Sequence, residues 1–120
     1  MKYMLLIYMD EYCLDEAARQ ACYTESMQLV DRLKAAGQFL AANPLQSVAT
    51  ATSVKVREGR RLVTDGPFTE TREQLGGYFL VEARDLDEAI NIAGQIPMAR
   101  KGTIEIRPIV DLTAPPARSI

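Results

Sequence analysis

The residues best suited to chemistry lie in one short polar segment near the middle of the chain. Asp65, Gly66 and Pro67 form a bend, and Glu70 and Arg72 follow it closely. An aspartate can accept hydrogen bonds from the backbone after it, a glycine permits positive φ, and a proline fixes φ. Two interpretations stay open: a tight structural turn, or a rigid bend that aims Asp65, Glu70 and Arg72 into a ligand cleft. In the second, Asp65 serves as a base or an orienting carboxylate, and Arg72 holds a polar substrate.

The residues after the bend carry further expectations. Phe68 is expected to attach the bend to the core. Residues 71–74 fit a one-turn helix, with Thr71 as its cap and the Gln74 side chain reaching back. The Gly76-Gly77 pair then lets the chain re-enter a sheet.

Composition narrows the available chemistry. The chain has 120 residues and no histidine, so carboxylates, Tyr, Cys, Lys or Arg must supply any reactive group, and neither a metal nor a cofactor is indicated. The net charge of −2 gives no basic footprint for nucleic acid, and no apolar run reaches the ~18 residues of a membrane span. Two cysteines form no disulfide framework, which favours the cytoplasm. Cys22 fits a small core residue, whereas an exposed Cys13 could be a reactive thiol.

Hydrophobic periodicity and turn residues predict the element order. The expected strands cover residues 2–9, 39–42, 47–57, 60–64, 77–83 and 103–109, with a turn at 58–59. A helix is expected from Asp15 to about Ala36, with an apolar stripe formed by Ala18, Cys22, Ser26, Leu29, Val30 and Leu33. A second helix should open at Asp85, end before Pro97, and bury Leu86, Ala89, Ile90 and Ala93. The domain is expected to span residues 1–110, followed by a flexible tail at 111–120.

This order predicts an α+β sandwich, most simply ferredoxin-like, with two helices on one face of a mainly antiparallel sheet. The covered face should carry Val54, Val56, Phe79, Val81, Ile104 and Ile106. The uncovered face should carry Lys55, Arg57, Tyr78, Leu80, Glu82, Glu105 and Arg107. Because the first strand is apolar on both sides, we expect a homodimer that closes sheet on sheet and leaves a cleft. Glu82, Glu105 and Arg107 then form a solvated ion-pair network or line that cleft.

The segment from Thr64 to Glu73, with the following Leu75-Gly76-Gly77-Tyr78, resembles the signature of the YCII-related proteins, in their DGPF branch. The first strand and residues 104–109 also match in order. The resemblance implies a dimeric α/β barrel of ferredoxin-like subunits with an active site in the cleft. In related proteins that site is proposed to hold a His-Asp pair. The aspartate carries over to Asp65, but no histidine can, and Tyr23 lies near where it would be.

Two functions follow as expectations. The first is a cytoplasmic homodimer that binds a small polar or anionic molecule, with lyase or isomerase chemistry at the family level. In it Asp65 is catalytic, Arg72 and Arg107 hold an anionic group, Tyr78 donates a hydrogen bond, and Glu70 lines the site. The alternative is a non-catalytic sensor or accessory module, since the resemblance also implies an association with extracytoplasmic-function sigma factors.

Overall fold

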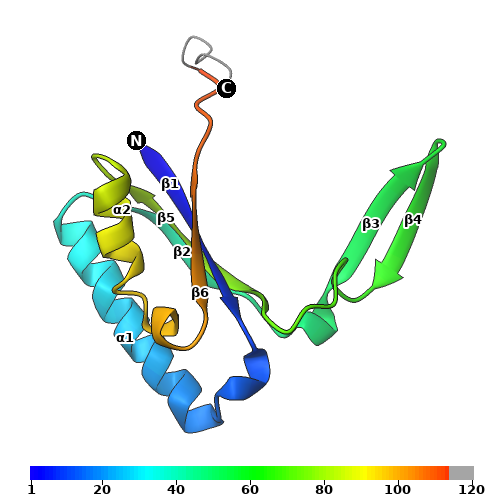
Figure 1. The fold of residues 1–120 in the computed structure, drawn as a ribbon, viewed down its shortest axis with the longest axis horizontal. Helices are drawn as coiled ribbons and strands as arrows, with labels where there is room; N and C mark the ends of the chain where they lie inside the picture. Colours follow the sequence, from blue (N-terminus) through cyan, green and yellow to red (C-terminus); the bar gives the residue numbers. More distant parts are fainter. Residues whose placement is uncertain (114–120) are drawn as a thin grey trace.

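A computed structural model describes residues 1–113 of the chain (Figure 1). It contains two α-helices, six strands and three short 3₁₀ turns, η1–η3. In chain order they are β1 (Lys2–Met9), η1 (Glu11–Cys13), α1 (Glu16–Ala35), β2 (Phe39–Pro44), η2 (Val48–Thr50), β3 (Thr52–Arg57), β4 (Arg60–Asp65), β5 (Gln74–Glu82), α2 (Leu86–Ala93), η3 (Pro97–Arg100) and β6 (Thr103–Pro108). Most of the expected tail, residues 114–120, lies outside the described residues.

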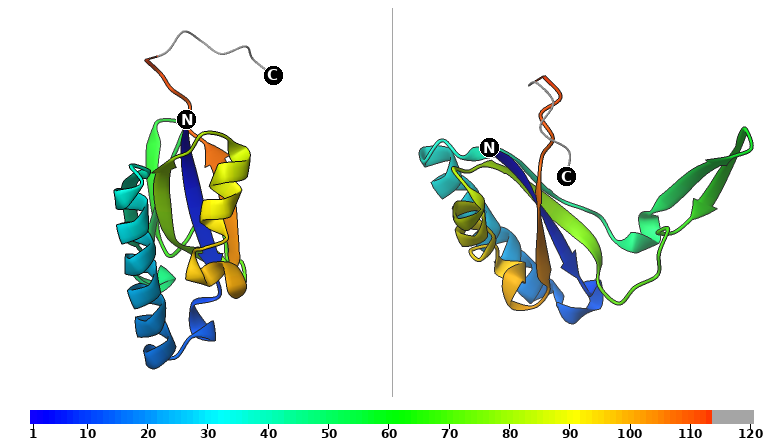
Figure 2. Two further views of the ribbon diagram at one scale, coloured as in Figure 1. Left: turned by 90° about the vertical axis from the view of Figure 1, so that its left-hand side faces the viewer. Right: turned by 45° about the horizontal axis from the view of Figure 1, so that its top comes forward.

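Four strands form one antiparallel sheet in the order β2-β5-β1-β6. Both helices lie on the same face of this sheet (Figure 2). The expected α+β arrangement, two helices on one face of an antiparallel sheet, is therefore confirmed.

Side-chain alternation along β1 builds the two faces of the sheet. Tyr3 and Leu5 are buried toward the helices, whereas Met4, Leu6 and Tyr8 are half-buried on the other side. We call the side without helices the bare face. The register places on it Lys2, Met4, Leu6, Tyr8, Tyr78, Leu80, Glu82, Thr103, Glu105 and Arg107.

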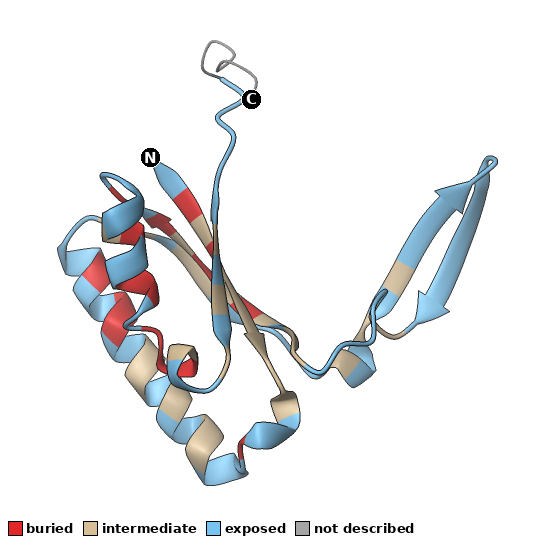
Figure 3. Ribbon diagram, viewed as in Figure 1, coloured by how far each residue is buried: buried red, intermediate tan, exposed pale blue. Residues whose placement is uncertain are grey.

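The core lies between the covered face and the two helices (Figure 3). It comprises Tyr3, Leu5, Leu29, Val30, Leu33, Phe79, Val81, Ala83, Ala89, Ile92, Ala93 and Ile96. Both helices begin where a carboxylate can cap them: Asp15 accepts a hydrogen bond from the Ala18 amide at 2.7 Å, and Asp85 from the Glu88 amide at 2.9 Å.

The buried side of α2 differs from the expected one. Leu86 and Ile90 are 51% and 48% exposed, and the helix instead buries Ala89, Ile92 and Ala93. Alanines at the contact let the helix lie close to the sheet, and the apolar side continues into Ile96. The assignment of Leu86 and Ile90 to the core was wrong because both lie on the outer side of this short helix.

The strands β3 and β4 form a separate hairpin that is not paired with the four-stranded sheet. Its turn residues, Glu58 and Gly59, have φ of 52° and 74°, as a two-residue hairpin loop requires. The expectation that Val54 and Val56 face the core, with Lys55 and Arg57 on the other face of the sheet, was therefore wrong. The η2 turn after β2 interrupts the expected strand at 47–57 and redirects the chain away from the sheet.

Candidate functional site

A cavity of about 450 Å³ lies between the first half of α1 and the sheet, where β1 ends and β5 begins. Its walls are mostly apolar, and the residues that carry this character include Ile7, Met9, Leu14, Val30, Phe79, Ile96 and Met98. Leu14, Val30, Phe79, Ile96 and Met98 are buried, so the inner end of the cavity is enclosed by core side chains.

The cavity exists because small residues face one another across it. On α1, the apolar stripe expected to pack on the sheet contains Cys22 and Ser26, which line the cavity instead of filling it. On the sheet, Gly76 and Gly77 line the opposite wall and carry no side chain. A Cβ on Gly77 would lie 3.1 Å from the Asn43 carbonyl oxygen, so glycine also permits the close approach of β2. The helix packs tightly only from Leu29 onward, where its side chains become large.

The cationic group of the cavity comes from α1, whereas other polar groups, among them Glu11, Asn43 and Gln74, come from the strands and the turns at the rim. Arg19 lines it, and its side chain is 40% exposed and paired with Glu16 at 3.3 Å. Tyr23, also 40% exposed, and Ser26 lie on the same helix. An exposed ion pair within one helix contributes little, so the Arg19 guanidinium can exchange Glu16 for an anionic ligand at low cost.

The rim of the cavity is unusually apolar for a surface. Tyr12 is 84% exposed, Met27 58%, Leu45 45% and Leu75 39%, and all four line the cavity. Exposed apolar side chains grouped around an opening are typical of a binding site.

Glu11 ties the rim to the turn before the hairpin. Its carboxylate accepts hydrogen bonds from the Ser47 hydroxyl at 2.8 Å and from the Val48 amide at 3.0 Å. These contacts hold η2 against η1. Glu11 lines both the cavity and a second, more open groove beside it.

That second groove contains part of the polar segment. Glu70 and Arg72 line it together with Gly66 and Pro67. Phe68, expected in the core, is 84% exposed. The groove and the cavity share Glu11, Tyr12 and Gln74, so the two hollows are neighbours.

The expected one-turn helix at residues 71–74 is absent. The Gln74 side-chain amide donates to the carbonyl oxygens of Thr69 and Thr71, both at 2.9 Å, and the Thr71 hydroxyl donates to the Glu73 carbonyl at 2.6 Å. In the expected helix cap, the side chains of Thr71 and Gln74 would bond to backbone amides. In the structure they donate to backbone carbonyl oxygens, and these bonds hold an irregular bend.

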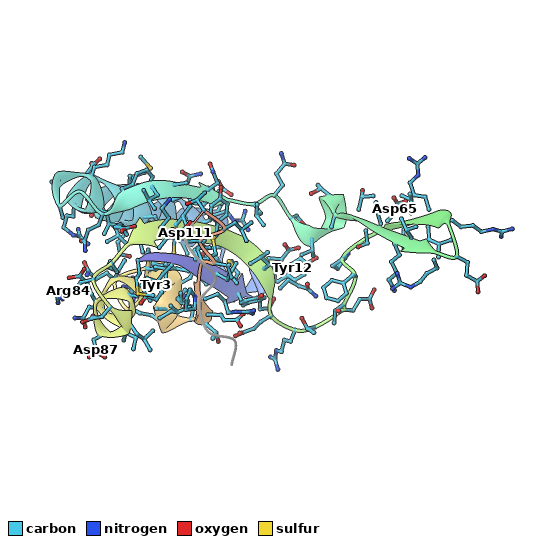
Figure 4. The ribbon with its side chains drawn as sticks, turned by 90° about the horizontal axis from the view of Figure 1, so that it is seen from above. Tyr3, Tyr12, Asp65, Arg84, Asp87 and Asp111 are labelled. Atoms are coloured by element: carbon cyan, nitrogen blue, oxygen red, sulfur yellow. The ribbon has the colours of Figure 1, made fainter. Side chains whose placement is uncertain are left out.

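Asp65 lines neither hollow, although the next residue, Gly66, lines the second groove; Asp65 lies at the exposed end of β4 opposite Thr52. Figure 4 shows it on the hairpin, well separated from Tyr12. Within residues 1–113 its carboxylate accepts no hydrogen bond, so the expected Asx-turn does not form; Pro67, two residues later, has no amide hydrogen to donate. The positive φ expected at Gly66 is present, at 105°.

The two remaining predicted site residues lie on the sheet. Arg107 is on the bare face, with its guanidinium 3.4 Å from the Glu105 carboxylate. The Tyr78 hydroxyl accepts a hydrogen bond from the Asn43 side chain at 2.9 Å, and Tyr78 is also among the residues that line the cavity. The structure thus distributes the five predicted residues over the hairpin, the groove, the bare face and the cavity edge.

One ion pair supports the cavity from outside. Arg100 of η3 forms two hydrogen bonds with Glu25 of α1, at 2.7 and 3.1 Å, and η3 also supplies Met98 to the cavity wall. Hydrogen bonding and charge from Arg100 hold the pKa of Glu25 below its usual 4.5. The same pair raises the pKa of Arg100.

A family model described as the YCII-related domain matches residues 1–113. The chain belongs to the YCII-related family. A relative in Rhizobium meliloti (strain 1021), called "Uncharacterized protein R00369", is 34% identical over 105 residues, which cover 79% of this chain and 85% of the relative. The resemblance found in the sequence to the YCII-related proteins is therefore confirmed.

Two features are absent from residues 1–113. No helix in this part of the YCII-related chain is both long and apolar enough to cross a bilayer. No group of three or more His, Cys, Asp or Glu residues in the same part is arranged to hold a metal ion.

Proposed function

We propose that this YCII-related protein binds a small molecule, with an apolar body and one anionic group, in the cavity between α1 and the sheet. The observation that carries the proposal is the cavity itself. Its volume of about 450 Å³ lies within the ~300–1,000 Å³ range of small-molecule sites, which are mainly apolar with a few placed polar groups. In this proposal the ligand lies on the helix side of the sheet. The sequence had instead suggested a cleft between two paired sheets, on the uncovered face.

The polar groups suggest how such a ligand is oriented. Arg19 supplies the cationic group at the helix side of the cavity, and the hydroxyls of Tyr23 and Ser26 offer hydrogen bonds on the same side. The apolar body then lies against Phe79, Ile96 and Met98. A guanidinium binds a carboxylate through two parallel hydrogen bonds, so a carboxylic acid fits this arrangement better than an alcohol.

The test compares matched ligands and matched variants. Benzoate, salicylate and octanoate are compared with benzamide and octanol by isothermal titration calorimetry. Arg19→Gln should weaken binding of the best acid about tenfold, equal to about 1.4 kcal/mol, because the site is partly exposed. Arg32→Gln is the control, since Arg32 lies on the same helix outside the cavity and bonds to Gln95 at 3.3 Å.

A second variant tests the location. Ser26→Leu adds side-chain volume at the cavity wall and should abolish binding while the fold, checked by circular dichroism, is retained. Failure of every compound to bind the wild-type protein would end the proposal, as would equal binding by Ser26→Leu.

The role of Asp65 stays a prediction with its own test. If Asp65 acts on a substrate, Asp65→Asn should remove turnover and leave stability unchanged, because its carboxylate is exposed and makes no hydrogen bond within residues 1–113. Gly66→Val should disturb the bend even though a Cβ there meets nothing within 4 Å, because φ is 105°. Full turnover in Asp65→Asn, with turnover lost only in Gly66→Val, would assign the effect to the bend and contradict a catalytic role for Asp65.

We also propose that the bare face pairs with a second copy of the chain. Met4, Leu6 and Leu80 are half-buried at its centre, and charged residues such as Glu82 and Arg107 are exposed at its ends. An apolar centre with a polar edge is typical of an interface. Leu80→Arg should give a monomer in analytical ultracentrifugation, and a wild-type monomer at 100 µM would refute the pairing.

A further inference from the structure

The hairpin formed by β3 and β4, residues 52–65, stands apart from the body of the molecule; we call it the arm. It is exposed almost throughout (Figure 3). A two-stranded hairpin alone in water is marginally stable, and three strands or a packed face are normally needed. Because its residues are exposed, the arm has no packing partner within residues 1–113, and two strands alone do not explain its stability.

One face of the arm has three valines at its centre, with Arg61 beside them and with Thr52 and Asp65 at the root of the arm. Val54 and Val63 are direct cross-strand partners, and Val56 lies on the same face, opposite Arg61. These three valines are 58%, 58% and 61% exposed, in the order Val54, Val63 and Val56. The other face carries Lys55, Arg57 and Arg60 together with Leu62. The arm thus has a docking face with an apolar centre of three valines and charged residues, Arg61 and Asp65, at its two ends, and an outer face that is mainly basic.

The arm and the bare face lie on the same side of the four-stranded sheet. The arm projects on the side of the sheet opposite the helices, so the bare face and the arm flank the same space (Figures 1 and 2). The root of the arm is held by two hydrogen bonds, from the Gly66 amide to the Ala51 carbonyl at 2.7 Å and from the Ser53 hydroxyl to the Gly66 carbonyl at 2.8 Å.

We infer that the arm packs its valine face against a second copy of this chain, whose sheet pairs with the bare face. The inference rests on the sheet pairing proposed above and adds a contact that the pairing alone does not require. In a two-fold dimer each copy gives one arm and receives one arm, so the contact closes without free ends.

The areas support this arrangement. Four strands of six to nine residues present a bare face of roughly 450 Å² in projection, a little more than half of the ~800 Å² per partner in a standard interface. The arm face adds roughly 200 Å², and the surface that receives the partner's arm adds a similar roughly 200 Å². Sheet pairing with both arms therefore reaches the size of a stable interface, whereas sheet pairing alone does not.

Charge favours the same partner. The arm carries four basic residues against two acidic ones, a net charge of +2, whereas the remainder of the chain carries −4. A second copy thus offers a body of opposite charge to the arm.

The experiment distinguishes the contribution of the arm to dimer formation from that of the sheet. The variant Val54→Thr/Val56→Thr/Val63→Thr keeps shape and strand preference but makes the docking face polar. By sedimentation equilibrium, its dimer dissociation constant should rise at least 100-fold, because three valine side chains lose their burial. Leu62→Thr, a matched change on the other face, should leave the dissociation constant within threefold of wild type. The wild-type arm amides should also exchange hydrogen more slowly at 100 µM than at 1 µM.

The possible outcomes distinguish the arm contact, the sheet pairing and the choice of partner. A dimer that the triple variant leaves intact, while Leu80→Arg dissociates it, would overturn the arm contact and leave the sheet pairing standing. A wild-type monomer at 100 µM would overturn both. Equal weakening by Leu62→Thr would overturn the assignment of the docking face. Binding of the arm to anionic phosphatidylserine vesicles without self-association would replace the second copy by a membrane surface and overturn the inference.

Discussion

Glu11 offers the most direct test of how the cavity rim and the root of the arm are held. Both of its carboxylate oxygens accept a hydrogen bond, one from the Ser47 hydroxyl and one from the Val48 amide. Glutamine keeps one acceptor oxygen for the Val48 amide and offers the Ser47 hydroxyl an NH₂ group in place of a charged oxygen, so both bonds lose the charge of their acceptor. A hydrogen bond to a charged group contributes ~1.5–3 kcal/mol when shielded from water. Because Glu11 is only half-buried, we expect about 1.4 kcal/mol for Glu11→Gln, a tenfold change in the local opening equilibrium.

Hydrogen exchange measured residue by residue provides the assay. In Glu11→Gln the amides of Val48 and Ala51 should exchange about tenfold faster, and in Glu11→Ala faster still, because both bonds are lost. Amides of β1 should not change. Asp10→Asn is the control: Asp10 accepts one bond, from the Tyr12 amide at 3.0 Å, and an asparagine oxygen can accept it too. Unchanged exchange at Val48 in Glu11→Gln would refute the view that this carboxylate holds the turn.

Two further predictions concern the body of the molecule. Because the pKa of Glu25 is lowered by Arg100, the stability that this pair contributes is fully present above pH 4.5 and is lost as the pH falls through the lowered folded value. Glu25→Gln should therefore be less stable than wild type in urea at pH 7, and the difference should vanish at low pH; a constant difference would contradict the linkage. A Cβ at Gly102 would clash with the Tyr8 carbonyl oxygen, so β1 and β6 must move apart. Gly102→Ala should cost about 3 kcal/mol and lower Tm by about 10 °C in scanning calorimetry, whereas Gly94→Ala, whose Cβ stays 3.6 Å from its nearest atom, should be neutral or slightly stabilising. Equal Tm values for these two glycine variants would refute the steric argument.

The sequence predicted the elements and the body of the fold because the signals for them are local. Asp15 and Asp85 cap the helices as expected, and the alternation along β1 places Tyr3 and Leu5 toward the helices. The burial of α2 was harder to predict, because an eight-residue helix with apolar residues on several sides can turn more than one of them inward. Packing against the sheet, which is not a local property, selects the alanine side.

The cavity could not be predicted in the same way, because it arises from side chains that are missing. Cys22 and Ser26 on α1 and the two glycines on β5 are distant in sequence, and each has an ordinary local explanation. Only the fold brings these small residues opposite one another. The available signal was the drop in side-chain size along the expected apolar stripe, from Leu29, Val30 and Leu33 back to Ser26, Cys22 and Ala18. A stripe that shrinks toward one end predicts a helix that cannot fill the space beneath it.

The arm shows why a strand pattern does not by itself assign a strand to a sheet. Val54, Val56 and Val63 alternate with polar residues, as in a half-buried strand, and this pattern predicted a core face within the same subunit. The structure leaves these valines exposed, so the pattern now describes a face that has no partner within residues 1–113. Selection for such a face is explained if a second copy covers it. The apolar alternation and the exposure of the valines are then two consequences of one interface. The wrong prediction of a core position and the proposed dimer contact therefore have the same physical origin.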